Sequence, residues 1–122
     1  MTKNHRNAGL TLVEIMIVVG IIGLLAAIMI PSFKRARAVS QANACIYNLR
    51  QIDVAANEFS QDHAAPAGTV LNYPGDLTPY IKLNSNGKIP GCPVGGTYAI
   101  AGVGARPTCS LGNTITPPHV LP

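Results

Sequence analysis

One acidic residue lies inside a long apolar segment near the N-terminus. The segment runs from Leu10 to Ile30, and the only polar side chain it holds besides Glu14 is Thr11. A carboxylate at the centre of a membrane costs roughly 2.5–3.5 kcal/mol. Glu14 therefore needs a cationic partner, or a place near the headgroups, where the dipole at a helix N-terminus favours an acid by about 0.3–1 kcal/mol.

The three cysteines form a second set of residues with possible chemistry. Cys92 and Cys109 have sixteen residues between them and flank a predicted hairpin. We predict a disulfide between them, since closing a loop of that size contributes ~3 kcal/mol. Cys45 is then left over, either buried against the C-terminal half or available as an alternative partner. Zinc held by the three cysteines and His119 is the other reading, but no CxxC or HxxxH spacing supports it. We predict no metal and no cofactor.

The remaining polar residues do not suggest an enzyme. The five acids contain no pair with catalytic spacing, and neither His63 nor His119 has a partner that the sequence reveals. The net charge of +4 is modest. Basic residues flank the apolar segment, where such residues usually contact lipid headgroups. We therefore expect no specific nucleic-acid partner. These residues are Lys3, Arg6, Lys34, Arg35 and Arg37.

The apolar segment is long enough to position Glu14 in a membrane. As a helix with ~1.5 Å rise per residue it extends about 31 Å, enough to cross the ~30 Å hydrocarbon core. A cleaved secretory signal fits poorly, because the run is longer than the usual ~7–15 residues and no A-x-A site follows it. An uncleaved anchor fits better.

Beyond Pro31 the pattern becomes amphipathic. Apolar residues recur at intervals of three or four, which predicts that one helix continues from about Leu10 to Gln61. They are Val39, Ala42, Ile46, Leu49, Ile52, Ala56 and Phe59. Residues 64–122 hold most of the prolines and glycines, which indicates a small loop-rich head that covers this stripe. The predicted class is α+β, with a long N-terminal helix packed on a small antiparallel β-sheet.

Turn residues and alternation locate the expected elements of the head. A short helix is predicted over Leu77–Lys82, with Asp76 as its cap. Thr97–Ala101 alternates like a strand, Gly102–Ala105 turns the chain, and Arg106–Ser110 returns beside it. Asn113–Thr116 is predicted as a third strand.

Residues Gly9 to Phe33, GLTLVEIMIVVGIIGLLAAIMIPSF, resemble the N-terminal motif of type IV pilins and type II secretion pseudopilins. The leader glycine, the Thr-Leu-Val-Glu sequence, Gly23 and Pro31 all have the family's spacing. One departure is Leu10, since the first mature residue of the family is usually phenylalanine. The resemblance implies four regions: leader 1–9, transmembrane and assembly helix 10–31, amphipathic stem 32–63 and β head 64–122.

The resemblance also implies roles for individual residues. A prepilin peptidase cuts after Gly9 and methylates the new N-terminus at Leu10, while Glu14, Gly23 and Pro31 serve assembly. The chemistry of the residues agrees, because cleavage creates an ammonium at Leu10 that can neutralise Glu14 of a neighbouring subunit. Gly23 and Pro31 weaken the helix between them, which gives either extensibility in a filament or ordinary flexibility of a single span.

On this resemblance the chain is a structural subunit of a type IV pilus-like filament or a type II secretion pseudopilus. Its expected partners are copies of itself in a helical filament, other pilin-like subunits, the prepilin peptidase and an inner-membrane assembly platform. The expected location is a single pass through the inner membrane with the head in the periplasm, and the filament in the periplasm or at the cell surface. A DNA-uptake filament subunit and a monomeric membrane-anchored envelope protein are the alternatives.

Overall fold

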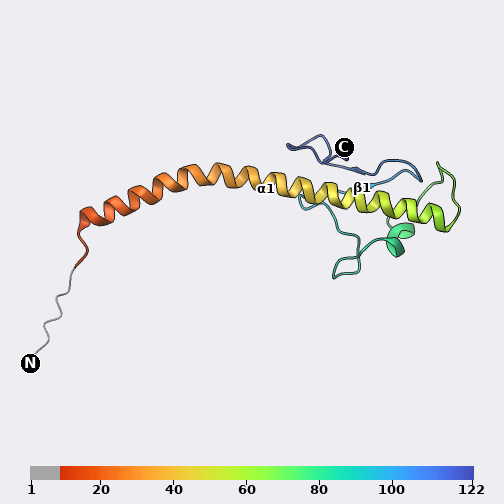
Figure 1. Ribbon diagram of the computed structural model, residues 1–122, viewed down its shortest axis with the longest axis horizontal. Helices are drawn as coiled ribbons and strands as arrows, with labels where there is room; N and C mark the ends of the chain where they lie inside the picture. The colour runs from red at the N-terminus through yellow and green to blue at the C-terminus, as the bar shows by residue number, and fades with distance from the viewer. Residues whose placement is uncertain (1–8) are drawn as a thin grey trace, which may run out of the picture. The chain divides into compact units, whose positions relative to one another are not determined.

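A computed structural model describes residues 9–122 of the chain, so most of the predicted leader, including Lys3 and Arg6, lies outside the described residues. The elements follow the order α1 (Leu12–Asp62), the 3-10 helix η1 (Gly75–Tyr80), β1 (Tyr98–Ala99) and β2 (Thr108–Cys109) (Figure 1). The chain forms two compact units, one ending at Ala36 and the other spanning Arg37–Pro122. Helix α1 contributes to both. A long helix with a small antiparallel sheet confirms the predicted α+β class.

Helix α1 has 51 residues and matches the predicted helix closely. It begins at Leu12, two residues after the predicted start at Leu10, because Thr11 caps it. It continues without a break past Pro31. The helix ends at Asp62, one residue from the predicted end at Gln61.

The core of the second unit forms on one face of α1. The buried residues of the helix recur every three or four positions: Ala42, Cys45, Leu49, Ile52, Ala55 and Ala56. Leu49 and Ile52 are fully buried and pack in one cluster with Leu77 and residues of the hairpin. The predicted stripe is therefore largely confirmed, with Cys45 rather than the half-buried Ile46 in its first turns.

The chain after α1 returns along the same helix on two sides. In Figure 1 the segment around η1 lies on one side of the second half of α1, and the C-terminal segment lies on the other. β1 and β2 pair antiparallel, with Tyr98 opposite Cys109 and Ala99 opposite Thr108. The second unit thus encloses the helix with loops and carries very little regular sheet.

Three predictions for the head need correction. η1 begins two residues earlier than the predicted helix, and Asp76 is not its cap, since the carboxylate accepts a hydrogen bond from the Asn72 N–H at 2.9 Å. Each strand has two residues rather than five. The third strand is absent from the described chain, because residues 113–116 form turns and bends and are followed by two prolines, which cannot donate to a ladder.

An isolated bridge that the sequence did not predict joins the start of the head to the hairpin. Val70 pairs with Gly102, and Val103 exchanges hydrogen bonds of 2.9 Å with Gly68 and Thr69. A Cβ at Gly102 would lie 2.5 Å from the Thr69 carbonyl oxygen. The hairpin turn therefore needs glycine at this position for close backbone approach.

Candidate functional site

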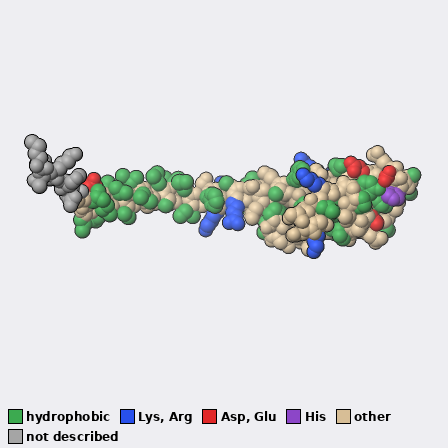
Figure 2. Space-filling view, turned by 90° about the horizontal axis from the view of Figure 1, so that it is seen from below, with side chains coloured by type: hydrophobic (Ala, Val, Ile, Leu, Met, Phe, Trp, Pro, Cys, Tyr) green, Lys and Arg blue, Asp and Glu red, His purple; other side chains and the backbone are tan. Residues whose placement is uncertain are grey.

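The first half of α1 exposes its apolar side chains on all sides. Every large apolar side chain from Leu10 to Ile30 is exposed, and Ile15, the least accessible, still shows 45% of its surface. Figure 2 shows this hydrophobic cover over the N-terminal part of the helix. The helix is long and apolar enough to cross a membrane, with a mean hydropathy of 2.8 over an 18-residue window of which none is buried. Such a surface needs lipid or other helices around it.

The predicted cleavage site precedes the first turn of this helix. Gly9 and Leu10 are exposed and have no regular secondary structure. The Glu14 N–H donates to Thr11 Oγ1 at 3.2 Å, and the Thr11 N–H donates to the Glu14 carboxylate at 3.5 Å. This reciprocal pair is a capping box. The Thr-x-x-Glu spacing is its signature in the sequence, a signal that our sequence reading did not use.

The other residues predicted to serve assembly lie further along the exposed span. Gly20 and Gly23 have nothing within 4 Å of the position where a Cβ would stand. Packing within this chain therefore does not require glycine at either position. Pro31 is exposed and lies inside the continuous helix.

The cysteines lie in the second unit, and their arrangement differs from the prediction. All three described cysteines are free and buried, so the predicted disulfide between Cys92 and Cys109 is not present. Instead the three sulfurs meet an imidazole nitrogen, and all four atoms lie within 4.8 Å of one another. We call this group the Cys3His cluster: Cys45, Cys92, Cys109 and His119. The sequence reading named these residues as the less favoured alternative.

Burial and hydrogen bonding set the acidity of two of these thiols. Burial raises the pKa of Cys45 to about 12, although the Tyr98 hydroxyl acts in the opposite direction. At Cys92 burial also acts to raise the pKa, but hydrogen bonds from the Val94 and Gly96 backbone amides, with the neighbouring thiols, bring it below its usual value. The backbone amides therefore stabilise negative charge on the Cys92 sulfur.

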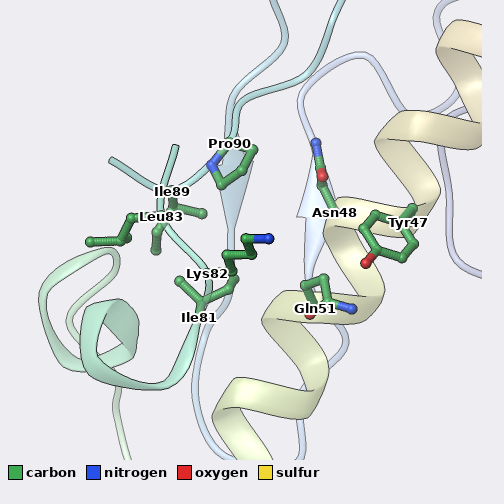
Figure 3. Close-up of a pocket in the computed structure, with 8 residues that line it drawn as sticks. All are labelled: Tyr47, Asn48, Gln51, Ile81, Lys82, Leu83, Ile89 and Pro90. Carbon is green, nitrogen blue, oxygen red and sulfur yellow. The ribbon is translucent and has the colours of Figure 1, made fainter. Parts of the chain in front are cut away.

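A pocket of about 200 Å³ lies beside the helix in the second unit. Figure 3 shows Tyr47, Asn48 and Gln51 of α1 on one side of it and the segment 81–90 on the other. Its lining holds one charged side chain, Lys82, and no acid, cysteine or histidine. The ionisable side chains of this lining are Tyr47 and Lys82.

Comparisons with known proteins identify the N-terminal segment. The prokaryotic N-terminal methylation motif matches residues 4–30. The type IV major pilin protein PilA of Myxococcus xanthus (strain DK1622) is 48% identical over 56 residues, which are 46% of this chain and 26% of that protein. The chain thus matches about a quarter of the length of this relative. No solved structure matches the chain. The N-terminal segment of this chain thus carries the prokaryotic N-terminal methylation motif and is similar in sequence to a type IV major pilin.

Proposed function

We propose that this chain is a structural subunit of a type IV pilus-like or type II secretion pseudopilus filament. In this proposal a prepilin peptidase cuts after Gly9 and methylates Leu10, and the subunits polymerise through their N-terminal helices. We also propose that the chain assembles with other pilin-like subunits on an inner-membrane platform, with its head on the periplasmic side. The observation that carries it is the exposed apolar span from Leu10 to Ile30, whose one acid, Glu14, lies four residues beyond the proposed new N-terminus.

The exposed span supports assembly because it suits two environments. Before assembly, lipid covers its side chains. In a filament, neighbouring helices would cover them, and the open space at Gly20 and Gly23 lets a helix approach closely.

The geometry at Glu14 supports a charge pair between subunits. Among residues 9–122 its carboxylate receives one long hydrogen bond of 3.5 Å, from the Thr11 N–H, and so keeps lone pairs for another donor. Cleavage after Gly9 would place an ammonium at Leu10. In surroundings of low dielectric, the ammonium of one subunit and the carboxylate of the next attract strongly, whereas either one alone is penalised. The pair would therefore favour one axial stagger between subunits.

The Glu14→Gln variant tests this proposal. Glutamine can keep the capping box but removes the charge. The variant should therefore remain stable in the membrane but lose at least 90% of its incorporation into sheared filaments. A tenfold loss of incorporation corresponds to about 1.4 kcal/mol. Glu58→Gln, at an exposed position of the second unit, is the matched control and should assemble normally. Normal assembly of Glu14→Gln would refute the charge pair. Absence of the wild-type chain from any filament in cells that make the assembly machinery would refute the function.

A further inference from the structure

We propose that the Cys3His cluster binds one structural zinc ion, which fastens the loops of the second unit to helix α1. Nothing in this inference depends on filament assembly, since all four ligands lie between Arg37 and Pro122.

The spacing of the donor atoms fits a tetrahedral zinc site. Zn–S bonds of about 2.3 Å and Zn–N bonds of about 2.0–2.1 Å place the ligand atoms of a tetrahedron roughly 3.5–3.8 Å apart. The four donor atoms of the cluster all lie within 4.8 Å of one another, and Cys92 Sγ is 3.4 Å from His119 Nδ1. A contraction of about 1 Å at the widest separation completes the geometry. Three thiolates and one imidazole are a ligand set typical of structural zinc.

Each ligand is held by a different part of the fold. Cys45 lies on the buried face of α1. Cys92 is the first residue of a turn in which the Gly95 N–H donates a hydrogen bond to the Cys92 carbonyl at 3.0 Å. Cys109 ends β2, and its carbonyl accepts a hydrogen bond from the Gly112 N–H at 2.9 Å. The His119 N–H then donates to the Gly112 carbonyl at 2.8 Å, which turns the C-terminal segment back toward the cluster.

The buried histidine indicates a stronger partner than a thiol. His119 is 1% exposed, and the side-chain partner of its Nδ1 in the described chain is the sulfur of Cys92. A thiol is a weak hydrogen-bonding group, and burying an imidazole without a good partner is unfavourable. A zinc–nitrogen bond would give Nδ1 a stronger partner than the Cys92 thiol.

The backbone around one of the three cysteines, Cys92, suits a metal-bound thiolate. Zinc binding would displace one proton from each of the three thiols to solvent, which leaves a site with a net charge of −1. The amides of Val94 and Gly96 donate to the Cys92 sulfur, as outer-shell donors do at metal–thiolate sites. Gly96 lies so close that a Cβ there would be 2.7 Å from Cys109 Sγ. The backbone thus encloses the cluster tightly.

Metal analysis of the full-length chain tests the site. The chain is purified without a polyhistidine tag, in mild detergent and without air, and its metals are measured by mass spectrometry. We expect about one zinc per chain and three thiols that react with alkylating reagents only after denaturation with a chelator. Replacing zinc by Co²⁺ should give the intense visible absorption of tetrahedral cobalt with thiolate ligands. This wild-type measurement needs no variant to fold.

Variants then assign the ligands. His119→Ala should lose at least 90% of the bound zinc, and His119→Cys should retain it, since four cysteines also bind zinc tetrahedrally. His63→Ala, which removes an exposed histidine outside the cluster, should keep the wild-type zinc content. Wild-type chain without zinc, whether its cysteines are free or joined in a disulfide, would overturn the inference. So would zinc that survives both His119→Ala and Cys109→Ser.

Discussion

At the residue scale, two small groups of side chains carry the chemistry of this chain. Glu14 is held by the capping box at the start of α1, and the four donors of the Cys3His cluster lie in the core of the second unit. Glu14 stands out in the sequence because an acid in a long apolar run has few explanations. His119 does not stand out, because only the fold shows that the proline-rich C-terminal segment returns to the cysteines.

The close approach of Gly96 to the cluster gives a prediction for a single methyl group. An alanine at this position would place its Cβ 2.7 Å from Cys109 Sγ, whereas an alanine at Gly91 would meet nothing within 4 Å. We expect Gly96→Ala to destabilise the second unit by about 1–3 kcal/mol through overpacking. Gly91→Ala, the matched control, should change the free energy of unfolding by less than about 0.5 kcal/mol. Urea unfolding of both variants in detergent, followed by near-ultraviolet circular dichroism, measures the difference. Equal stabilities would contradict the close packing at the cluster.

At the element scale, helix α1 was predictable and the head was predictable only in outline. The apolar run and the repeat at three and four residues define a helix whose ends differ from the prediction by one or two residues. Cys45 continues the spacing of Ala42 and Leu49, so counting it as apolar would have placed it in the core. The short strands have no comparable signal, because their positions depend on contacts such as the bridge between Val70 and Gly102.

The buried face of α1 gives a second prediction. Leu49 is fully buried in the core, while Val54 lies on the opposite side of the helix and is 50% exposed. Leu49→Ala should lower the free energy of unfolding of the second unit by about 2–5 kcal/mol, because it removes buried apolar contacts and leaves a cavity. Val54→Ala should cost less than about 0.5 kcal/mol. Chemical unfolding of the two variants under the same conditions decides the matter, and a similar loss for both would mean that this face of α1 is not the core.

At the scale of the whole molecule, the chain combines an exposed apolar span with a second unit that has little regular structure of its own. That unit has two strands of two residues each and one 3-10 helix besides α1. In small units with a limited core, a disulfide or a metal ion often adds stability. The sequence predicted a disulfide between Cys92 and Cys109, whereas the structure brings three free thiols together with His119.

Removing the proposed zinc therefore has a predicted effect on stability. A chelator together with a thiol reductant should lower the unfolding midpoint of the full chain by about 10 °C or more. A loss of about 2 kcal/mol suffices for this, since each 1 kcal/mol shifts the midpoint of a domain of this size by roughly 4–8 °C. His119→Ala provides the control, because a chain that no longer binds zinc should not respond to the chelator. An equal fall in the midpoint of this variant would show that the chelator acts elsewhere.

Processing at the N-terminus is the central claim, because a charge pair between subunits requires a free amino group at Leu10. Mass spectrometry of the intact chain, isolated from cells with an active prepilin peptidase, measures it most directly. We predict a chain that begins at Leu10 and is one methyl group heavier than the unmodified sequence. A chain that still carries residues 1–9 in those cells would contradict the account.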